Sequence, residues 1–416
     1  MMKKVVQTLC TLLLSTTIAC ASDQQDENHN LTHLKAISNG TLHDKSSSWQ
    51  GKLEDLAPYK NLQNLSVENL DKSHMNTFNQ ILSNLSSLQE LELGELTNAT
   101  DNDTVSLVRA LPNTLQKLSL NMSHVSPLRA KETLAKSFRR FSQLKSLKLQ
   151  TSGITDNNLI NVFPTSLTKL DVDNGDMHFH YIFKELSTLS ELQVLKLGHV
   201  GHVGGNFLLE NLSSLPTLKE FHWNCSRWVI QNILEVIHTL PHTLQVLKLE
   251  YSYRTKPQEG IVDLIKWFPP HLQGLHLSHF VLNDNAMQAL MAVSTNLTIL
   301  SLRNNNIHND GLQVLMSMFP KKFLNLQKLD LYENLFDEEI AQHLFTMLSS
   351  NTTLQDISLF EDTRNLKFEV PQENYTLQKL GGNYQLTKTT RQTLNNNVKR
   401  AVTLEDLASP KFFLAS

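Results

Sequence analysis

A leucine pattern that occurs twice between residues 297 and 336 constrains this chain more than any other feature. Both copies read L-x-x-L-x-L-x-x-N-x-Φ, where Φ is apolar, and they begin 29 residues apart, at Leu297 and Leu326. One such unit is too small to bury its own leucines, so it needs similar units stacked on either side. The pattern therefore predicts a repeat array rather than a single globular core.

The first leucine of the pattern recurs along most of the chain. Twelve segments match L-x-x-[LIF]-x-[LVW], at intervals of 23 to 29 residues, and they begin at Leu62, Leu88, Leu115, Leu144, Leu167, Leu192, Leu218, Leu244, Leu272, Leu297, Leu326 and Leu354. A weaker thirteenth match contains Leu377 and Leu380, and residues 31–37 (LTHLKAI) are expected to form a degenerate first strand. Terminal units of such arrays are atypical because they shield the open ends.

Each repeat is expected to contain one strand and one helix. Residues 326–331 (LQKLDL) alternate apolar and polar side chains, which is the period of a half-buried strand. Residues 230–240 (IQNILEVIHTL) place apolar side chains three and four positions apart, which is the helical period. Several repeats also carry a proline shortly before the first leucine, where it ends the helix and turns the chain into the strand.

Residues 62–382 resemble the ribonuclease-inhibitor-like class of leucine-rich repeats, found in animal inhibitors and in exported proteins of bacteria that live with eukaryotic cells. The resemblance implies an α/β solenoid, or horseshoe, of about 12–13 repeats with a parallel sheet on the concave face and helices on the convex face. Asn305 and Asn334 match the family's asparagine, which hydrogen-bonds neighbouring turns. Other repeats have residues such as Leu70 and Leu96 in this slot, so irregular turns are expected in the first two thirds of the array.

The expected organisation has four parts. Residues 1–21 are interpreted as a signal peptide, and residues 22–50 as a polar segment that includes a candidate N-terminal cap. The repeat domain is expected over residues 51–385 and a cap helix with a tail over residues 386–416.

The proposed signal peptide has a small-x-small cleavage site. Two lysines precede a short apolar stretch, and the triplet Ala-Cys-Ala at 19–21 fits cleavage that releases a chain beginning at Ser22. A second interpretation places the cut before Cys20, which would then be acylated as in a lipoprotein. Thr17 stands where such sites usually have leucine, which favours plain secretion. A secreted, periplasmic or cell-surface location is predicted, with no later stretch apolar enough to span a bilayer.

Composition narrows the class of protein further. The formal net charge of −3 provides no basic excess for a nucleic-acid partner. Removal of residues 1–21 leaves Cys225 as the single cysteine, so no disulfide can form within the mature chain. Animal extracellular proteins of this family usually cap their arrays with paired cysteines, so the composition favours a bacterial exported protein.

Catalytic and metal-binding motifs are weak. Cys225 follows a predicted strand and is expected to be a buried small hydrophobic residue rather than a nucleophile. Two close histidine pairs, His178 with His180 and His199 with His202, lack a third ligand at a spacing typical of metal sites. We therefore expect no catalytic residue, no metal and no cofactor.

The open face of the predicted sheet offers a binding surface instead. In each repeat the leucines should point into the core and the intervening residues outward, so Leu300 and Leu329 should be buried and Ser301 exposed. Along this face the pattern predicts an acidic N-terminal part, a basic middle and aromatic anchors near the C-terminal end. The candidate partner-binding residues are Lys148, Lys196, His222, Lys248, His276, Arg303, Tyr332 and Phe360.

These observations predict a non-catalytic protein-protein interaction scaffold, exported from a bacterium, that binds a protein on the concave face. Host proteins are candidate partners, while nucleic acid is not. The alternative is a surface or periplasmic lipoprotein with a structural role, for which Cys20 is the candidate lipidation site. An enzyme that uses Cys225 is the less favoured third interpretation.

Overall fold

The computed structural model describes residues 33–36, 60–123, 137–151, 163–173, 186–199, 212–226, 228–251, 259–293, 295–319, 322–347, 351–359 and 379–381. The expected signal peptide, its Cys20 and the expected cap at 386–416 lie outside the described residues. The chain divides into two compact units, Met1–Leu218 and Lys219–Ser416, which are described in turn as unit 1 and unit 2.

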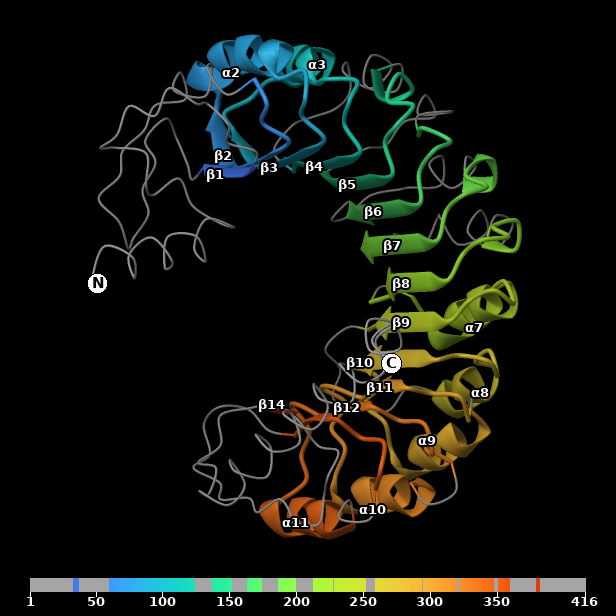
Figure 1. Ribbon diagram of the computed structural model, residues 1–416. Coiled ribbons are helices and arrows are strands. Elements are labelled where there is room, and N and C mark those ends of the chain that lie inside the picture. Colours follow the sequence, from blue (N-terminus) through green and yellow to red (C-terminus); the bar gives the residue numbers. More distant parts are fainter. Residues whose placement is uncertain are drawn as a thin grey trace, which may run out of the picture. The chain divides into compact units, whose positions relative to one another are not determined.

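Unit 1 is a layer of parallel strands with helices on one face (Figure 1). Each described strand pairs with the next along the chain, and these strands are β1 (His33–Ala36), β2 (Asn64–Asp71), β3 (Glu90–Thr97), β4 (Lys117–Met122), β5 (Ser146–Thr151), β6 (Lys169–Asp173) and β7 (Val194–His199). The described helices are α2 (Lys72–Asn84), α3 (Asp101–Ala110) and the 3-10 helix η2 (Leu186–Thr188). β1 pairs in parallel with β2, which confirms the degenerate first strand.

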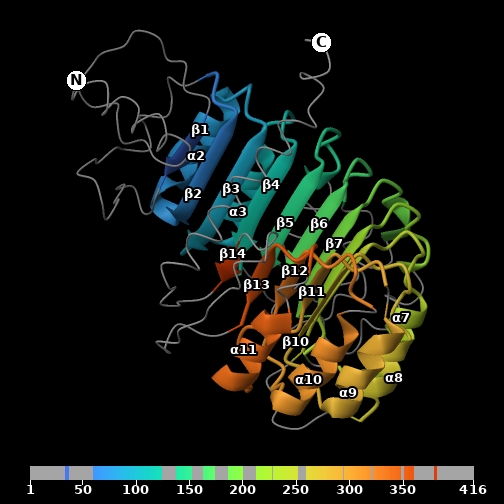
Figure 2. The same ribbon diagram turned by 60° about the horizontal axis from the view of Figure 1, so that its bottom comes forward.

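Unit 2 repeats the same architecture (Figure 2). Its described strands also pair in chain order, all parallel, and are β8 (Glu220–Asn224), β9 (Val246–Glu250), β10 (Gly274–Ser278), β11 (Ile299–Ser301), β12 (Lys328–Asp330), β13 (Asp356–Ser358) and β14 (Lys379–Gly381). Its described helices are α7 (Ile230–His238), α8 (Ile261–Lys266), α9 (Asp284–Ala289), η4 (Leu290–Ala292), α10 (Asn309–Met318) and α11 (Glu338–Met347). The weak thirteenth match thus supplies a strand, and the predicted α/β leucine-rich-repeat solenoid is confirmed as the fold.

The repeated leucines form the core between the strands and the helices. Leu247, Leu300 and Leu329 have at most 1% of their surface exposed, as the alternating pattern predicts. These three leucines lie in register with the equivalent residues of the neighbouring strands, so each packs against side chains of the repeats before and after it. Truncating a core leucine of this kind to alanine typically costs about 2–5 kcal/mol.

The first two complete repeats differ from the expectation of irregular turns. β2 and β3 extend to eight residues each, and Leu70 and Leu96 are buried partners within them. β2 leads directly into α2, where the Asp71 carboxylate accepts a hydrogen bond from Ser73 N at 2.9 Å. The expectation is therefore wrong here, because an apolar residue in the asparagine slot continues the strand into the core and a side-chain cap begins the helix.

Two further repeats close their turns with an asparagine displaced by two residues. Ser123 N donates to Asn121 Oδ1 at 3.1 Å, and Ser226 N donates to Asn224 Oδ1 at 3.2 Å. These local hydrogen bonds stand in place of the contacts between repeats that Asn305 and Asn334 make in later repeats. Within the described residues, no helix combines the length and apolar character needed to cross a bilayer.

Candidate partner-binding face

The sheet face opposite the helices, called the open face below, presents outward side chains in register. In unit 1 the central row runs through Ser66, Glu92, Ser119, Lys148, Asp171 and Lys196. In unit 2 it runs through His222, Lys248, His276, Ser301, Asp330 and Ser358. Neighbours in such a row lie about 5 Å apart. The outward residues of successive strands are therefore aligned in register within each unit, as the alternating pattern predicts.

The charges in unit 1 alternate instead of forming a basic block. Lys148 is exposed and stands beside Asp171, which stands in turn beside the half-buried Lys196. Glu90, two residues before Glu92 on β3, forms an ion pair with Lys117 of β4, with 3.2 Å between its Oε2 and the lysine Nζ. Alternation of this kind suits hydrogen bonding with a mixed protein surface better than attraction of a polyanion.

His276 adds less positive charge to the open face of unit 2 than expected. Burial and the nearby Lys248 ammonium lower the pKa of His276 to about 4, so this imidazole is neutral at pH 7. His222 Nε2 lies 3.4 Å from Glu220 Oε2. Lys248 stands between these two histidines in the row. The prediction of a basic middle is therefore wrong for His276, which can act only as a neutral hydrogen-bonding group.

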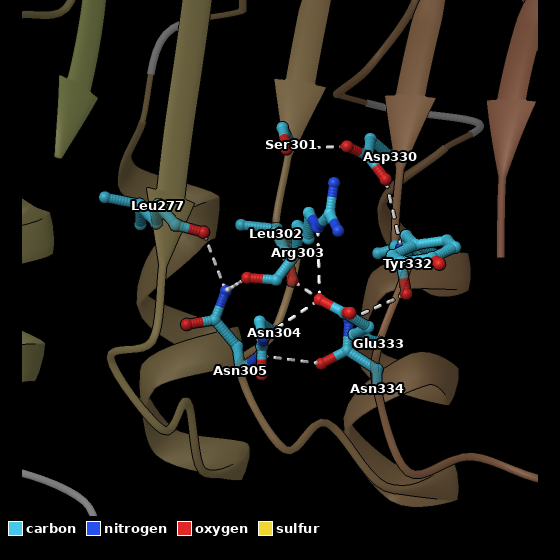
Figure 3. A network of polar contacts seen from close by, with 11 residues as sticks. Leu277, Ser301, Leu302, Arg303, Asn304, Asn305, Asp330, Tyr332, Glu333 and Asn334 are labelled. Atoms are coloured by element: carbon cyan, nitrogen blue, oxygen red, sulfur yellow. Dashed lines mark hydrogen bonds and ion pairs between the residues drawn. The ribbon is translucent and has the colours of Figure 1, made fainter. Parts of the chain in front are cut away.

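Arg303, Tyr332 and their polar neighbours form the most organised group on the described part of the open face (Figure 3). The Arg303 guanidinium carbon lies 4.4 Å from the centre of the Tyr332 ring, within the range of a cation-π contact. Its Nε donates to Glu333 Oε2 at 3.2 Å, and Asn304 Nδ2 donates to the same oxygen at 2.9 Å. The arginine is therefore held between an aromatic face and a carboxylate. We call Ser301, Arg303, Asn304, Asp330, Tyr332 and Glu333 the Arg303 cluster.

Asp330 fixes the strand side of the Arg303 cluster. Its Oδ1 accepts from Tyr332 N at 3.1 Å, and its Oδ2 accepts from the Ser301 hydroxyl at 3.1 Å. Ser301 retains only 6% of its surface exposed. The prediction that Ser301 is solvent-exposed is therefore wrong, because the neighbouring aspartate covers it from the adjacent repeat.

A recurring left-handed turn places Glu333 beside Arg303. His279, Asn304 and Glu333 occupy the same slot of successive repeats and have φ values of 64°, 59° and 57°. The backbone continues its hydrogen bonds between repeats here, with His279 N bonded to Asn304 O and Asn304 N bonded to Tyr332 O, both at 2.9 Å. This conformation is uncommon for a glutamate, so the fold must supply energy to hold it.

Asn305 and Asn334 supply that support directly beneath the Arg303 cluster. Asn334 Oδ1 accepts from the backbone nitrogens of Asn305 and Ile307, each at 3.0 Å. Asn305 Oδ1 accepts from Phe280 N at 2.8 Å. Asn305 Nδ2 donates to Leu277 O at 2.7 Å (Figure 3). The cluster therefore stands on a turn that is hydrogen-bonded through three repeats.

The electrostatics keep Arg303 charged. Partial burial works to lower the pKa of Arg303, but the hydrogen bond and negative charge of Glu333, with further help from Asp330, outweigh it and raise the pKa. With one cation and two carboxylates the Arg303 cluster has a net negative charge. It can accept a basic side chain while it offers the guanidinium edge to a carbonyl or carboxylate.

The remaining sequence predictions have different outcomes. Phe360 lies outside the described residues. Cys225 is fully buried, as predicted, its Sγ donates to Glu250 O at 3.2 Å, and burial raises the pKa of its thiol. In the described ranges no group of three potential metal-ligating side chains occurs. His178, His180 and His202 belong to the segments not described.

Sequence reasoning missed the partners that hold Arg303 in place. It placed Arg303 and Tyr332 among the partner-binding residues of the open face, but it did not identify Asp330 or Glu333 as members of the site. The sequence did contain a usable signal. Glu333 directly precedes Asn334, as Asn304 directly precedes Asn305, so Glu333 and Asn304 hold equivalent positions in adjacent repeats. Equivalent slots in adjacent repeats lie side by side, which brings the glutamate next to Asn304 and Arg303.

Comparisons with known proteins give likenesses to solved structures. No family model matches the chain, and no curated protein does. One similar structure is an internalin from Listeria monocytogenes, 19% identical, with 90% of this chain and 94% of that one covered and a TM-score of 0.43. Another is the leucine-rich repeat-containing protein LegL7 from Legionella pneumophila, 15% identical, with coverages of 73% and 97% and a TM-score of 0.42.

Proposed function

We propose that this protein is a non-catalytic scaffold, exported from a bacterium, that binds a protein partner on its open face. Proteins of a eukaryotic host are the partner class that we would test first. The observation that carries the proposal is the Arg303 guanidinium, held 4.4 Å from the Tyr332 ring and bonded to Glu333. Arginine and tyrosine are the residue types enriched among residues that dominate interface energies.

Preorganisation makes this pair suitable as an anchor. Arg303 loses rotamer freedom before any partner arrives, because Tyr332 and Glu333 already hold it. The arginine nevertheless keeps 49% of its side chain exposed, so its remaining donors are accessible. A side chain ordered in advance lowers the entropic cost of binding. The central row of unit 2, which includes Lys248 and the neutral His276, supplies polar side chains around this anchor.

The interior supports a scaffold rather than an enzyme that uses Cys225. This thiol has no exposed surface, and its raised pKa leaves it protonated at neutral pH. A nucleophilic cysteine needs access to a substrate and a thiolate form, and this residue provides neither. The sequence of residues 1–21 supports export, and mass spectrometry of the mature N-terminus tests it: Ser22 indicates secretion, whereas an acylated Cys20 indicates a lipoprotein.

Site-specific photo-crosslinking tests the proposed face. A photoreactive phenylalanine analogue is introduced at Tyr332, and in a matched protein at Gln313, an exposed residue of helix α10 in the same unit. Both proteins are exposed to host-cell extract, and their adducts are identified by mass spectrometry. We expect a discrete protein adduct from position 332 only. Adducts from position 313 alone, or none from either, would contradict the open face as the binding surface.

Affinity measurements with the captured partner then test the anchor itself. We expect Arg303→Ala to weaken binding by roughly thirtyfold, the effect of an anchor worth about 2 kcal/mol. Arg303→Lys keeps the positive charge but loses the planar guanidinium that stacks on Tyr332 and its fixed set of N–H donors. This variant should therefore lose most of the affinity as well. Gln313→Ala is the control and should bind normally. Full retention of affinity by Arg303→Lys would show that charge alone matters and that the anchor is misassigned.

A further inference from the structure

A groove of about 540 Å³ lies at the N-terminal ends of β10 to β13, away from the Arg303 cluster. Nine residues line it, and none of them is a lysine, arginine, aspartate, glutamate or aromatic residue other than histidine. Gln273, Thr298, Gln327 and Gln355 form its central row, one residue before the strands. Thr298 at the groove and Arg303 in the cluster are five residues apart along an extended chain, a distance of roughly 15 Å. One ligand can therefore bind in the groove while another contacts the Arg303 cluster.

The central row carries the side-chain amides of three glutamines and one threonine hydroxyl, that of Thr298, which donates to Gln273 O at 3.1 Å. Strands β10 to β13 are in register, so these four residues stack at about 5 Å intervals. Their backbone groups are used within the fold, since Thr298 N bonds to Gln273 O, Gln327 N to Thr298 O, and Gln355 N to Gln327 O, each at 2.8 Å. The Gln327 and Gln355 side chains are exposed. Their amides can therefore both donate to a ligand and accept from it.

Two buried polar atoms at the groove have no hydrogen-bond partner among the described residues. These are His271 Nε2 and Thr353 Oγ1. In other repeats, the hydroxyl of Thr114, Ser166 or Thr217, which occupies the slot of Thr353, donates to a leucine carbonyl of the preceding repeat at 2.6 to 2.9 Å. Thr353 departs from that arrangement. Buried polar groups are normally satisfied, so a ligand toward which either side chain rotates would complete a hydrogen bond that the described residues leave open.

The chemistry of the lining selects the ligand. Phosphate recognition depends on lysine and arginine, and protein anchors are typically aromatic or arginine, neither of which lines the groove. Drug-like apolar ligands need mainly apolar walls, and most of the lining here consists of amides and hydroxyls. Sugar hydroxyls both donate and accept hydrogen bonds, as the side chains of this groove do. We propose that this groove binds a neutral oligosaccharide, aligned across the four repeats.

Binding of defined neutral sugars to the full chain tests the proposal. Cellohexaose, chitohexaose and maltohexaose are titrated in separate experiments, with saturation-transfer NMR and calorimetry as readouts. We expect at least one to bind, and Gln327→Ala to weaken that binding roughly tenfold, the equivalent of one lost hydrogen bond. Gln89→Ala is the matched control, because Gln89 holds the same repeat slot in unit 1, and it should leave sugar binding unchanged.

A second variant separates binding from folding. Thr353→Val removes a hydroxyl that has no partner in the described structure, so it should not lower the urea midpoint of unfolding, whereas sugar binding should weaken by roughly tenfold. The proposal is overturned if none of the three sugars binds, or if Gln327→Ala and Thr353→Val both bind as the unaltered protein does. Binding of a glutamine-rich peptide through these residues, without any sugar, would assign the groove to a peptide and also overturn it.

Discussion

The Asn334 side chain gives the sharpest stability prediction, because it holds the turn beneath the Arg303 cluster. It accepts from the backbone nitrogens of Asn305 and Ile307 and donates to the carbonyl oxygens of Leu302 and Leu331, at 2.8 to 3.0 Å. Asn305 and Ile307 are fully buried. Asn334→Ala therefore leaves two buried N–H groups without a partner, each at a cost of about 1–3 kcal/mol. The expected loss in the free energy of unfolding is about 2–6 kcal/mol.

A graded series of variants makes this reasoning testable. Asn305→Ala leaves one buried N–H group, that of Phe280, without its acceptor, so its loss should be smaller, at about 1–3 kcal/mol. Asn325→Ala, at an exposed asparagine of the same unit, should change stability by no more than about 0.5 kcal/mol. Urea unfolding followed by circular dichroism measures all three. A loss for Asn334→Ala that is no larger than that for Asn305→Ala or Asn325→Ala would refute the argument.

Three further predictions follow from burial. Ser301→Ala should cost about 1 kcal/mol in urea unfolding, because it breaks the bond to Asp330 at a site 6% exposed, and no measurable loss would contradict that bond. The free energy of unfolding should fall as the pH is lowered from 6.5 to about 4, because in this range His276 is protonated in the unfolded chain but not in the folded chain, where its pKa is lowered. His276→Gln should flatten this fall. An unchanged profile in that variant would count against the lowered pKa of His276. Cys225 should stay unlabelled by a thiol reagent in native buffer and react only after unfolding; rapid native labelling would reopen the enzyme interpretation.

The fold was accessible from the sequence because its signal is periodic. Leucines at a two-residue interval that recur every 23 to 29 residues specify a buried strand face in each repeat, and repetition makes the signal robust to individual departures. The turns were less accessible. Leu70 and Leu96 stand in the slot that Asn305 and Asn334 occupy in later repeats, yet they continue regular strands. Burial of an apolar side chain there substitutes for the hydrogen bonds of the asparagine.

The candidate site was accessible only in part. The outward phase of Arg303 and Tyr332 follows from the two-residue period, and the structure places these two residues in contact. The burial of Ser301 and the neutral state of His276 do not follow from it. Both depend on how closely a neighbouring repeat covers the side chain, and residues of different repeats are 25 to 29 positions apart in this part of the chain.

The sequence by itself determined the repeat, the inward and outward faces of each strand and the two asparagines that tie successive turns. It could do so because all three depend on residue types at fixed short spacings. Only the tertiary structure decided that Glu333 takes a left-handed conformation beside Arg303. It alone decided that His271 Nε2 and Thr353 Oγ1 have no hydrogen-bond partner among the described residues at a neutral groove. Those features arise from contacts between stacked repeats, whose strength depends on distance and solvent exclusion rather than on local pattern.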